Sequence, residues 1–156
     1  MELKVSLEYA ELEDIQSLVL IITEAYNPIK KSLSRLPGIL VNTKSMLNKR
    51  IIDKRVYKVV IRPKKCIGTY DLCIDERNNC HFSHFAIIPK YQNQGLGKYV
   101  LDEIIRQLKE KKVETITLEI YEKTPSLYQF YDSFGFGIHG KKEIKGEKIN
   151  ILRLLL

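Results

Sequence analysis

Long hydrophobic runs are absent from this 156-residue sequence. No run approaches the roughly 20 apolar residues that cross a bilayer, so we expect no membrane span. The first residues alternate and carry acids instead of a basic segment followed by an apolar one, so we expect no signal peptide. With 44% hydrophobic and 29% charged residues, the chain is predicted to be a cytoplasmic protein with one domain over residues 1–156.

Cysteine is scarce as well. Cys66, Cys73 and Cys80 lie in segments with strand patterns and show no CxxC spacing. An odd number of cysteines without paired spacing argues against a disulfide framework or a metal site. We therefore expect buried free thiols, as in a reducing cytoplasm, and no bound metal.

Acidic residues are fewer than basic ones, which gives a formal net charge of +7. A basic balance attracts nucleic acid, an acidic membrane surface or a polyanionic small molecule. The lysines are spread along the chain, whereas a nucleic-acid-binding domain needs them clustered with aromatics on one face. We therefore do not expect nucleic acid as a partner.

Hydrophobic periodicity predicts eleven helices and strands. The first helix carries an apolar face from Leu12 to Tyr26, and Asn27-Pro28 is predicted to end it. The predicted order is strand 3–8, helix 12–26, helix 43–52, strands 56–62, 66–74 and 80–88, helix 95–111, strand 114–121, a helix that begins at Thr124-Pro125, and strands 136–144 and 148–155. This order, β-α-α-β-β-β-α-β-α-β-β, predicts an α/β fold with a mixed sheet and flanking helices.

The last predicted strand ends in a nearly continuous apolar run, "INILRLLL". An exposed sheet edge tolerates such a run poorly. We expect this strand to be covered, either by the rest of the chain or by a partner copy in a homodimer.

A polar loop with glycines at 95 and 97 leads directly into an amphipathic helix. The first N–H groups of a helix are unpaired and carry partial positive charge, and glycines let an anion approach them closely. The loop lacks the Gly-Lys-Ser/Thr of a Walker A motif and the third glycine of the dinucleotide fingerprint. Taken alone, the glycines fit a phosphate site or a tight turn without a ligand.

The segment "FAIIPKYQNQGLGKYVL" resembles the signature of the GNAT (general-control-related N-acetyltransferase) superfamily. In that family a strand ends in a hydrophobic-x-Val-x-Pro run, and a Gln/Arg-x-x-Gly-x-Gly/Ala loop binds the pyrophosphate of acetyl-coenzyme A. Gln92, Gly95 and Gly97 occupy the loop positions, and Ile87 and Pro89 fit the strand end.

Two further segments resemble the same family. "FYDSFGF" is similar to its Tyr-x-x-x-Gly-Phe element, with Tyr131, Gly135 and Phe136 in place, and "CIGTYDL" is similar to its strand with an Ile/Val-Gly pair. The resemblance implies the GNAT acyl-CoA N-acyltransferase fold. It also implies direct acetyl transfer from acetyl-CoA to a primary amine of a small molecule or protein, or, as the alternative, a catalytically silent acyl-CoA-binding or sensor domain.

The resemblance further implies which residues contact acetyl-CoA. The backbone N–H of Phe85 would polarise the thioester carbonyl, and Ile87 would pair with the pantetheine arm. Thr124 stands where many members have an asparagine that contacts this arm. The implied cofactor-binding residues are Phe85, Ala86, Ile87, Gln92, Asn93, Gln94, Gly95, Leu96, Gly97, Lys98 and Thr124, with added charge from Lys90.

Tyr131 is the implied proton donor to the departing thiolate, although its spacing also suits a core tyrosine. Tyr128 is the fallback donor, but it lacks the motif spacing. The base is open: His81 falls near the family's glutamate position, Glu119 on the neighbouring strand is a second candidate, and ordered water alone is a third. Strict alternation would place His81, Ser83 and Phe85 on one face of their strand and Phe82 and His84 on the other.

In this fold the segment 26–52 usually forms one wall of the acceptor site. Here it is basic and hydroxyl-rich with few acids. A polyamine would favour acidic walls, so a small amine, or a peptide N-terminus with acidic neighbours, fits better as the acceptor.

Overall fold

The computed structural model of the protein describes residues 4–33 and 36–156. The predicted order of helices and strands is confirmed, with three short 3₁₀ helices added. Along the chain the elements are β1 (Val5–Tyr9), η1 (Leu12–Asp14), α1 (Ile15–Lys30), η2 (Gly38–Leu40), α2 (Thr43–Ile52), β2 (Val56–Ile61), β3 (Lys65–Ile74), β4 (Asn79–Ile87), η3 (Pro89–Tyr91), α3 (Leu96–Glu110), β5 (Thr115–Tyr121), α4 (Pro125–Asp132), β6 (Gly137–Ile144) and β7 (Glu147–Leu155). Within the described ranges, no helix has both the length and the hydropathy that a bilayer crossing requires.

The predicted end of the first helix is wrong. Helix α1 continues through Pro28 and ends at Lys30. A proline lacks the N–H that would bond to the preceding turn, so in the last turn of a helix it removes a single bond. The helix therefore tolerates Pro28 at this position.

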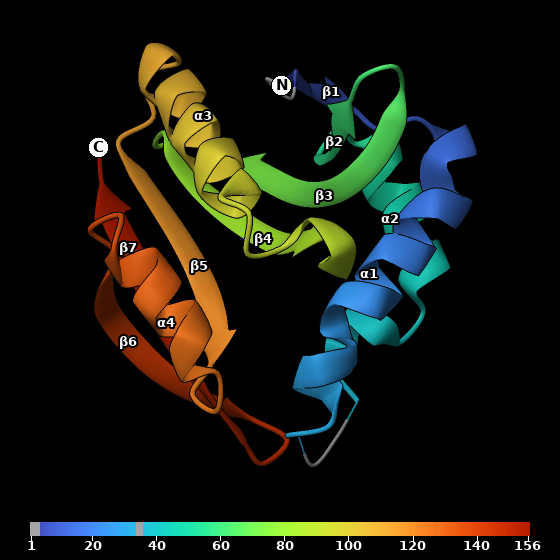
Figure 1. Cartoon of the computed structure of the whole chain (residues 1–156). Helices are drawn as coiled ribbons and strands as arrows, with labels where there is room; N and C mark the ends of the chain where they lie inside the picture. The colour runs from blue at the N-terminus through green and yellow to red at the C-terminus, as the bar shows by residue number, and fades with distance from the viewer. Residues whose placement is uncertain (1–3, 34–35) are drawn as a thin grey trace.

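The seven strands form one mixed sheet in the order β1-β2-β3-β4-β5-β7-β6. Helices α3 and α4 lie on one face of it and α1 and α2 on the other (Figure 1). Each pair of helices closes its own apolar core. The core beneath α3 contains Val100, Leu101 and Ile104, and the core beneath α1 contains Leu18 and Ile22.

The apolar last strand is covered within the chain. Strand β7 lies between β5 and β6 and is paired antiparallel with both. The edge strand on this side of the sheet is β6, whose residues are mostly exposed and include Lys141, Lys142 and Glu143. Charged residues on an edge strand discourage pairing with another chain. Covering β7 therefore does not require the partner copy that we considered.

The three cysteines lie in β3 and β4 as free thiols, but the expectation that they are buried holds for one of them alone. Cys80 is buried, whereas Cys66 and Cys73 are partly exposed. Burial raises the pKa of Cys80 to about 12, so its thiol stays protonated and behaves as a small apolar group.

Strands β4 and β5 are paired only at their beginnings. The parallel ladder joins Asn79 to Thr115, Cys80 to Ile116 and His81 to Thr117, and then the two strands diverge (Figure 1). Beyond His81, β4 remains paired with β3, and β5 remains paired with β7. The sheet therefore consists of two arms with an open strand edge on each side of the divergence.

We predict that Gly68 is required for the close approach of β3 to β4. A Cβ atom at Gly68 would lie 2.8 Å from the backbone oxygen of Ala86, whereas one at Gly140 would lie 3.5 Å from the side chain of Ile151. Gly68→Ala should lower the free energy of unfolding by about 1–3 kcal/mol through this clash. The matched control Gly140→Ala should change it by less than about 0.5 kcal/mol.

Urea denaturation of both variants against the native protein measures the difference. Equal stabilities of the Gly68→Ala and Gly140→Ala proteins would contradict this prediction. They would show that β3 and β4 can move apart at residue 68 without lowering the free energy of unfolding.

Candidate functional site

Two glutamine side chains shape the loop between β4 and α3. Gln92 donates from Nε2 to the carbonyl oxygen of Ile87 at 2.7 Å, and Gln94 donates from Nε2 to that of Lys90 at 2.8 Å. The backbone N–H of Gln92 donates to the carbonyl of Pro89 at 3.1 Å. Gln92 therefore holds the loop in shape, and its own N–H is not available to a ligand.

The N–H groups from Asn93 to Lys98 are different. They donate to no acceptor among residues 4–33 and 36–156. Asn93 and Gly95 have φ angles of 58° and 80°, and these left-handed conformations turn the loop into the start of α3. The first unpaired N–H groups of a helix form a ready site for an anion.

Packing within the chain does not require glycine at either loop position. A Cβ at Gly95 would meet no atom within 4 Å, and one at Gly97 would make ordinary contacts, 3.7 Å from Cζ of Phe130. The space above Gly95 is therefore available to a ligand that needs to approach the backbone, whereas the Cβ position of Gly97 is directed at Phe130 and Ile87.

Three lysines add positive charge around this loop. Lys90 and Lys98 are exposed, and Lys65 of β3 places its Nζ 5.3 Å from the ring centroid of Tyr91 in the loop. The sequence analysis did not assign Lys65 to this site, because it precedes the loop by a whole hairpin and no local pattern links them.

The open edge of β4 presents backbone groups toward the divergence from β5. The N–H of Ile88 donates to the carbonyl of Ile67 on the β3 side at 2.8 Å. Since peptide groups alternate in direction along a strand, those of Ile87 point away from β3, and those of Ala86 point toward it. This edge can pair with an extended ligand as with an added strand.

A bulge interrupts β4 just before this edge. Tyr70 of β3 stands opposite two residues, His84 and Phe85, and His84 has a φ of 55°. The extra residue breaks the alternation of faces. The expectation that His84 faces away from His81 and Ser83 is therefore wrong: all three line the same cavity, and the ring of Phe85 packs on the other face, beside Tyr70.

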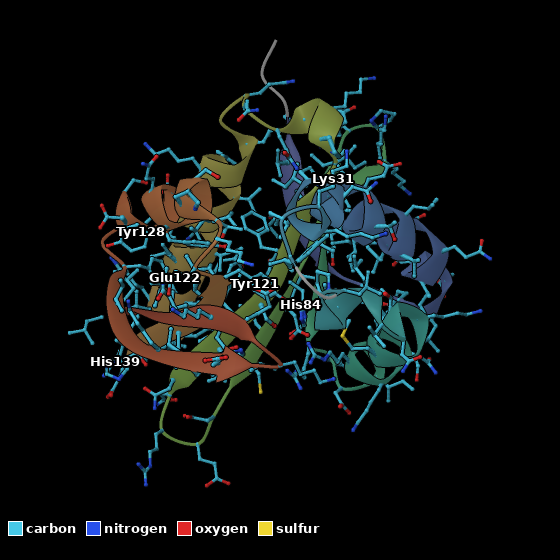
Figure 2. All side chains as sticks on the ribbon, turned by 90° about the horizontal axis from the view of Figure 1, so that it is seen from below. Lys31, His84, Tyr121, Glu122, Tyr128 and His139 are labelled. Atoms are coloured by element: carbon cyan, nitrogen blue, oxygen red, sulfur yellow. The ribbon has the colours of Figure 1, made fainter. Side chains whose placement is uncertain are left out.

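The cavity has a volume of about 720 Å³ and spans both arms of the sheet. Its walls come from α1, the segment before α2, α2 itself, β4, β5 and the β6–β7 hairpin. His84 of β4 and Tyr121 of β5 mark opposite sides of it near the centre of Figure 2. The cavity brings together His81 and Glu119, the two candidate bases, whereas Tyr131 does not line it.

Tyr131 lies on the other face of the sheet. It is 6% exposed, and its ring packs against those of Phe130 and Phe136. Burial raises the pKa of Tyr131 well above its usual value, and the phenol of Tyr26, which lines the cavity, acts in the same direction. Because its pKa is raised, the hydroxyl retains its proton at neutral pH. It makes no hydrogen bond to any described residue, so this proton is available for donation to a ligand.

The two candidate bases differ in their partners. Oε1 of Glu119 lies 2.5 Å from Nζ of Lys142, so a ligand must compete with that ammonium group for the carboxylate. Loss of hydration lowers the pKa of His81, which leaves the imidazole neutral at pH 7 and able to accept a proton. Both side chains are exposed to the cavity.

Thr124 precedes α4 and is 7% exposed. Its hydroxyl donates to the carbonyl of Tyr121 at 2.5 Å. The side-chain oxygen therefore has only lone pairs left for a ligand.

The sequence analysis missed a group of charged residues behind the cavity. Nη1 of Arg50 lies 2.6 Å from Oδ2 of Asp71 and 2.9 Å from Nδ1 of His84, and Nε of Arg55 lies 3.4 Å from Oδ1 of Asp71. Burial, followed by the charge of Arg50, lowers the pKa of His84 to about 4. The ring is therefore neutral at pH 7 and accepts from Arg50 at Nδ1, so its proton is on Nε2.

The chain is 35% identical over 77 residues to the [ribosomal protein bS18]-alanine N-acetyltransferase of Haemophilus influenzae, which covers 49% of this chain and 51% of that protein. It is 37% identical over 71 residues to the spermine/spermidine N(1)-acetyltransferase of Bacillus subtilis, which covers 45% and 47%. The chain thus spans about half the length of the curated relatives it matches.

Solved structures share the fold over nearly the whole chain. The ribosomal-protein-S18-alanine N-acetyltransferase of Escherichia coli superposes with a TM-score of 0.80 at 18% identity, covering 97% of this chain and 94% of that one. The PaiA N-acetyltransferase of Thermoplasma acidophilum, solved in complex with coenzyme A, gives 0.79 at 16% identity, covering 98% and 99%. The family model described as "Acetyltransferase (GNAT) domain" matches residues 34–153. Because this match covers most of the sequence, the chain belongs to the GNAT acetyltransferase family.

Proposed function

We propose that this protein is an acetyl-CoA-dependent N-acetyltransferase that moves the acetyl group directly to a primary amine. The observation that carries the proposal is the continuity of the site. Unpaired N–H groups at the start of α3 lead to the open edge of β4, and this edge leads to a cavity that spans β4 and β5.

The residues present fit coenzyme A. The N–H groups from Asn93 to Lys98, including those of Gln94, Gly95, Leu96 and Gly97, are free to bind the pyrophosphate, and the empty space above Gly95 lets it come close. Phe85 and Ile87 would hold the pantetheine arm through their peptide groups. Ala86 and Thr124 would contribute packing alone, since their donors are directed into the chain.

Bound acetyl-CoA supplies a thioester, whose C–S bond breaks as the C–N bond to the amine forms. The protein's part is to hold the two reactants in line and to handle the protons. The N–H of Phe85 would stabilise the negative charge that develops on the carbonyl oxygen. Tyr131 would give its proton to the departing sulfur, and the amine's proton would pass to Glu119 or His81 in the cavity wall, directly or through water.

The acceptor enters from the cavity side of the sheet. The relatives named above differ in acceptor: one name specifies an alanine of a ribosomal protein and the other specifies spermine or spermidine. Arg50 and Arg55 line this cavity, and their positive charge opposes the binding of a polyamine. A small amine or a peptide amine therefore fits better.

The cofactor proposal predicts a change in thermal stability. Acetyl-CoA at a hundred times its Kd should stabilise the native protein by about 2.7 kcal/mol, which raises Tm by roughly 5–10 °C. Gly97→Asp places a carboxylate beside the pyrophosphate and should abolish this rise. Gly97→Ala, which meets only ordinary contacts in the chain, is the matched control and should keep most of it.

Differential scanning fluorimetry with and without acetyl-CoA provides the measurement. No rise in Tm for the native protein at millimolar acetyl-CoA would rule out the cofactor proposal.

The second prediction concerns Tyr131. Tyr131→Phe removes one oxygen and keeps the ring packing, so kcat should fall by roughly 10²–10⁴-fold, the usual contribution of a positioned acid. KM for acetyl-CoA should remain near the native value, because the lost interaction develops in the transition state. Since burial raises the pKa of Tyr131, the phenol stays protonated, and the native kcat should not fall between pH 7 and about 9 through its ionisation.

Thiol release with a panel of amines is the assay, and Tyr128→Phe on the same helix is the matched control. Equal turnover by the Tyr131→Phe and native proteins would remove Tyr131 from the mechanism. Binding of acetyl-CoA without thiol release from any amine would favour the catalytically silent domain instead.

A further inference from the structure

Two arginines share one buried carboxylate at the back of the cavity. The side chain of Asp71 is 3% exposed, whereas those of Arg50 and Arg55 are 26% and 30% exposed and line the cavity. Asp71 does not line this cavity itself. It therefore anchors both guanidinium groups from behind, and their exposed portions face the space where an acceptor would sit.

The charges at this end of the cavity do not balance. One carboxylate faces two guanidinium groups, which leaves an excess of one positive charge, and the two glutamates that also line the cavity, Glu119 and Glu147, are paired with Lys142 and Lys123. Neither histidine beside the arginines compensates, because loss of hydration lowers the pKa of both His81 and His84 and leaves each ring neutral at pH 7. The excess positive charge is therefore available to an anion that enters the cavity.

The arginines also keep hydrogen-bond donors free. A guanidinium group has five N–H donors, and both hydrogen bonds of Arg50 to described residues start from its Nη1. Nε of Arg55 is buried against Asp71 at 3.4 Å, so the donors of Arg55 that remain for a ligand are those on its two Nη atoms. A planar carboxylate matches the paired donors of such groups better than a spherical anion does.

The anion would lie close to the reacting centre. Nη1 of Arg50 is 2.9 Å from Nδ1 of His84, and His84 directly precedes Phe85, to whose N–H we assign the thioester carbonyl. An amine placed at this carbonyl would thus be separated from an anion on the arginines by the length of a small molecule. This separation suits a compound that carries both groups within a few bonds.

The rim of the cavity is apolar. Leu36, Val41 and Ile144 line it, and they are 46%, 49% and 44% exposed. These side chains lie where the remainder of an acceptor would leave the cavity, and they favour a hydrocarbon group there.

We propose that Arg50 and Arg55 form an anion subsite in this cavity, and that the acceptor is a small amine carrying a carboxylate within a few bonds of its amino group. Free α-amino acids and peptides with an acidic second residue both offer this chemistry. The proposal rests on the acetyltransferase function proposed above and specifies the substrate class for the same site.

Matched pairs of acceptors test it. Thiol release from acetyl-CoA is measured with L-leucine against L-leucinamide, and with Ala-Asp amide against Ala-Asn amide. In the native protein the carboxylate member of at least one pair should have a kcat/KM about tenfold higher, mainly through KM, because a charge-assisted bidentate contact is lost in the other member. The pair that shows the preference distinguishes a free amino acid from a peptide.

Variants of Arg55 test whether this residue causes the preference for the carboxylate-bearing acceptor. Arg50 still pairs with Asp71 in these variants. Arg55→Gln should reduce the preference for the carboxylate to near one, and Arg55→Lys should retain part of it. Lys64→Gln removes a positive charge from the exposed β2–β3 turn and is the control, which should keep the native preference. Equal kcat/KM within both pairs, or an unchanged preference in Arg55→Gln, would overturn the proposal and leave the acetyltransferase function standing.

A readout without turnover separates the two proposals. If no amine releases thiol, the acetyltransferase function fails, and the subsite is then tested by Tm alone. L-leucine should raise the Tm of the native protein above the effect of L-leucinamide, and this difference should vanish in Arg55→Gln. No difference in the native protein would overturn the anion subsite too.

Discussion

The pairing between β4 and β5 stops after three residues on each strand, and each proposed functional element depends on this stop. Strand β4 keeps its hydrogen bonds to β3, and β5 keeps its bonds to β7, so both arms remain part of one sheet. The groups that would have joined the arms are left unpaired inside the molecule. An unpaired strand edge ordinarily promotes pairing with another chain and aggregation. Here the unpaired edge faces the gap between the two arms, where an extended ligand can pair with it.

The divergence also connects the two faces of the sheet. Tyr131 lies beneath α3 and α4, whereas the cavity lies on the side of α1 and α2. Where β4 and β5 diverge after His81 and Thr117, no strand pairing separates the two sides. A proton donor and an acceptor cavity on opposite faces can therefore serve one reaction, provided that the reacting bond lies in the gap.

The bulge at His84 links this backbone geometry to the charged residues. One extra residue turns the imidazole into the cavity, where its Nδ1 accepts a hydrogen bond from Arg50, which is itself held by the buried Asp71. A guanidinium–carboxylate pair at the back of a cavity is costly to desolvate and is stable only with such additional bonds. The network therefore helps to fix the strand just before the N–H of Phe85.

Sequence analysis predicted the features that depend on neighbouring residues. The glycine loop, the strand before it and Tyr131 belong to short motifs, and the order of elements follows from periodicity. It could not predict the bulge, which leaves no mark on the alternation of "CHFSHF". It also could not group Arg50 with Asp71 and His84. These two residues follow Arg50 by 21 and 34 positions in the chain and meet it only after folding.

Amide hydrogen exchange tests the central claim most directly, because it reports on the open edge of β4 itself. If acetyl-CoA pairs with this edge, its addition should slow exchange at Phe85 and Ile87 and at the amides from Asn93 to Lys98. The amides of the distant edge strand β6 should exchange at unchanged rates. Binding of acetyl-CoA that leaves the amides of Phe85 and Ile87 unprotected would contradict the account.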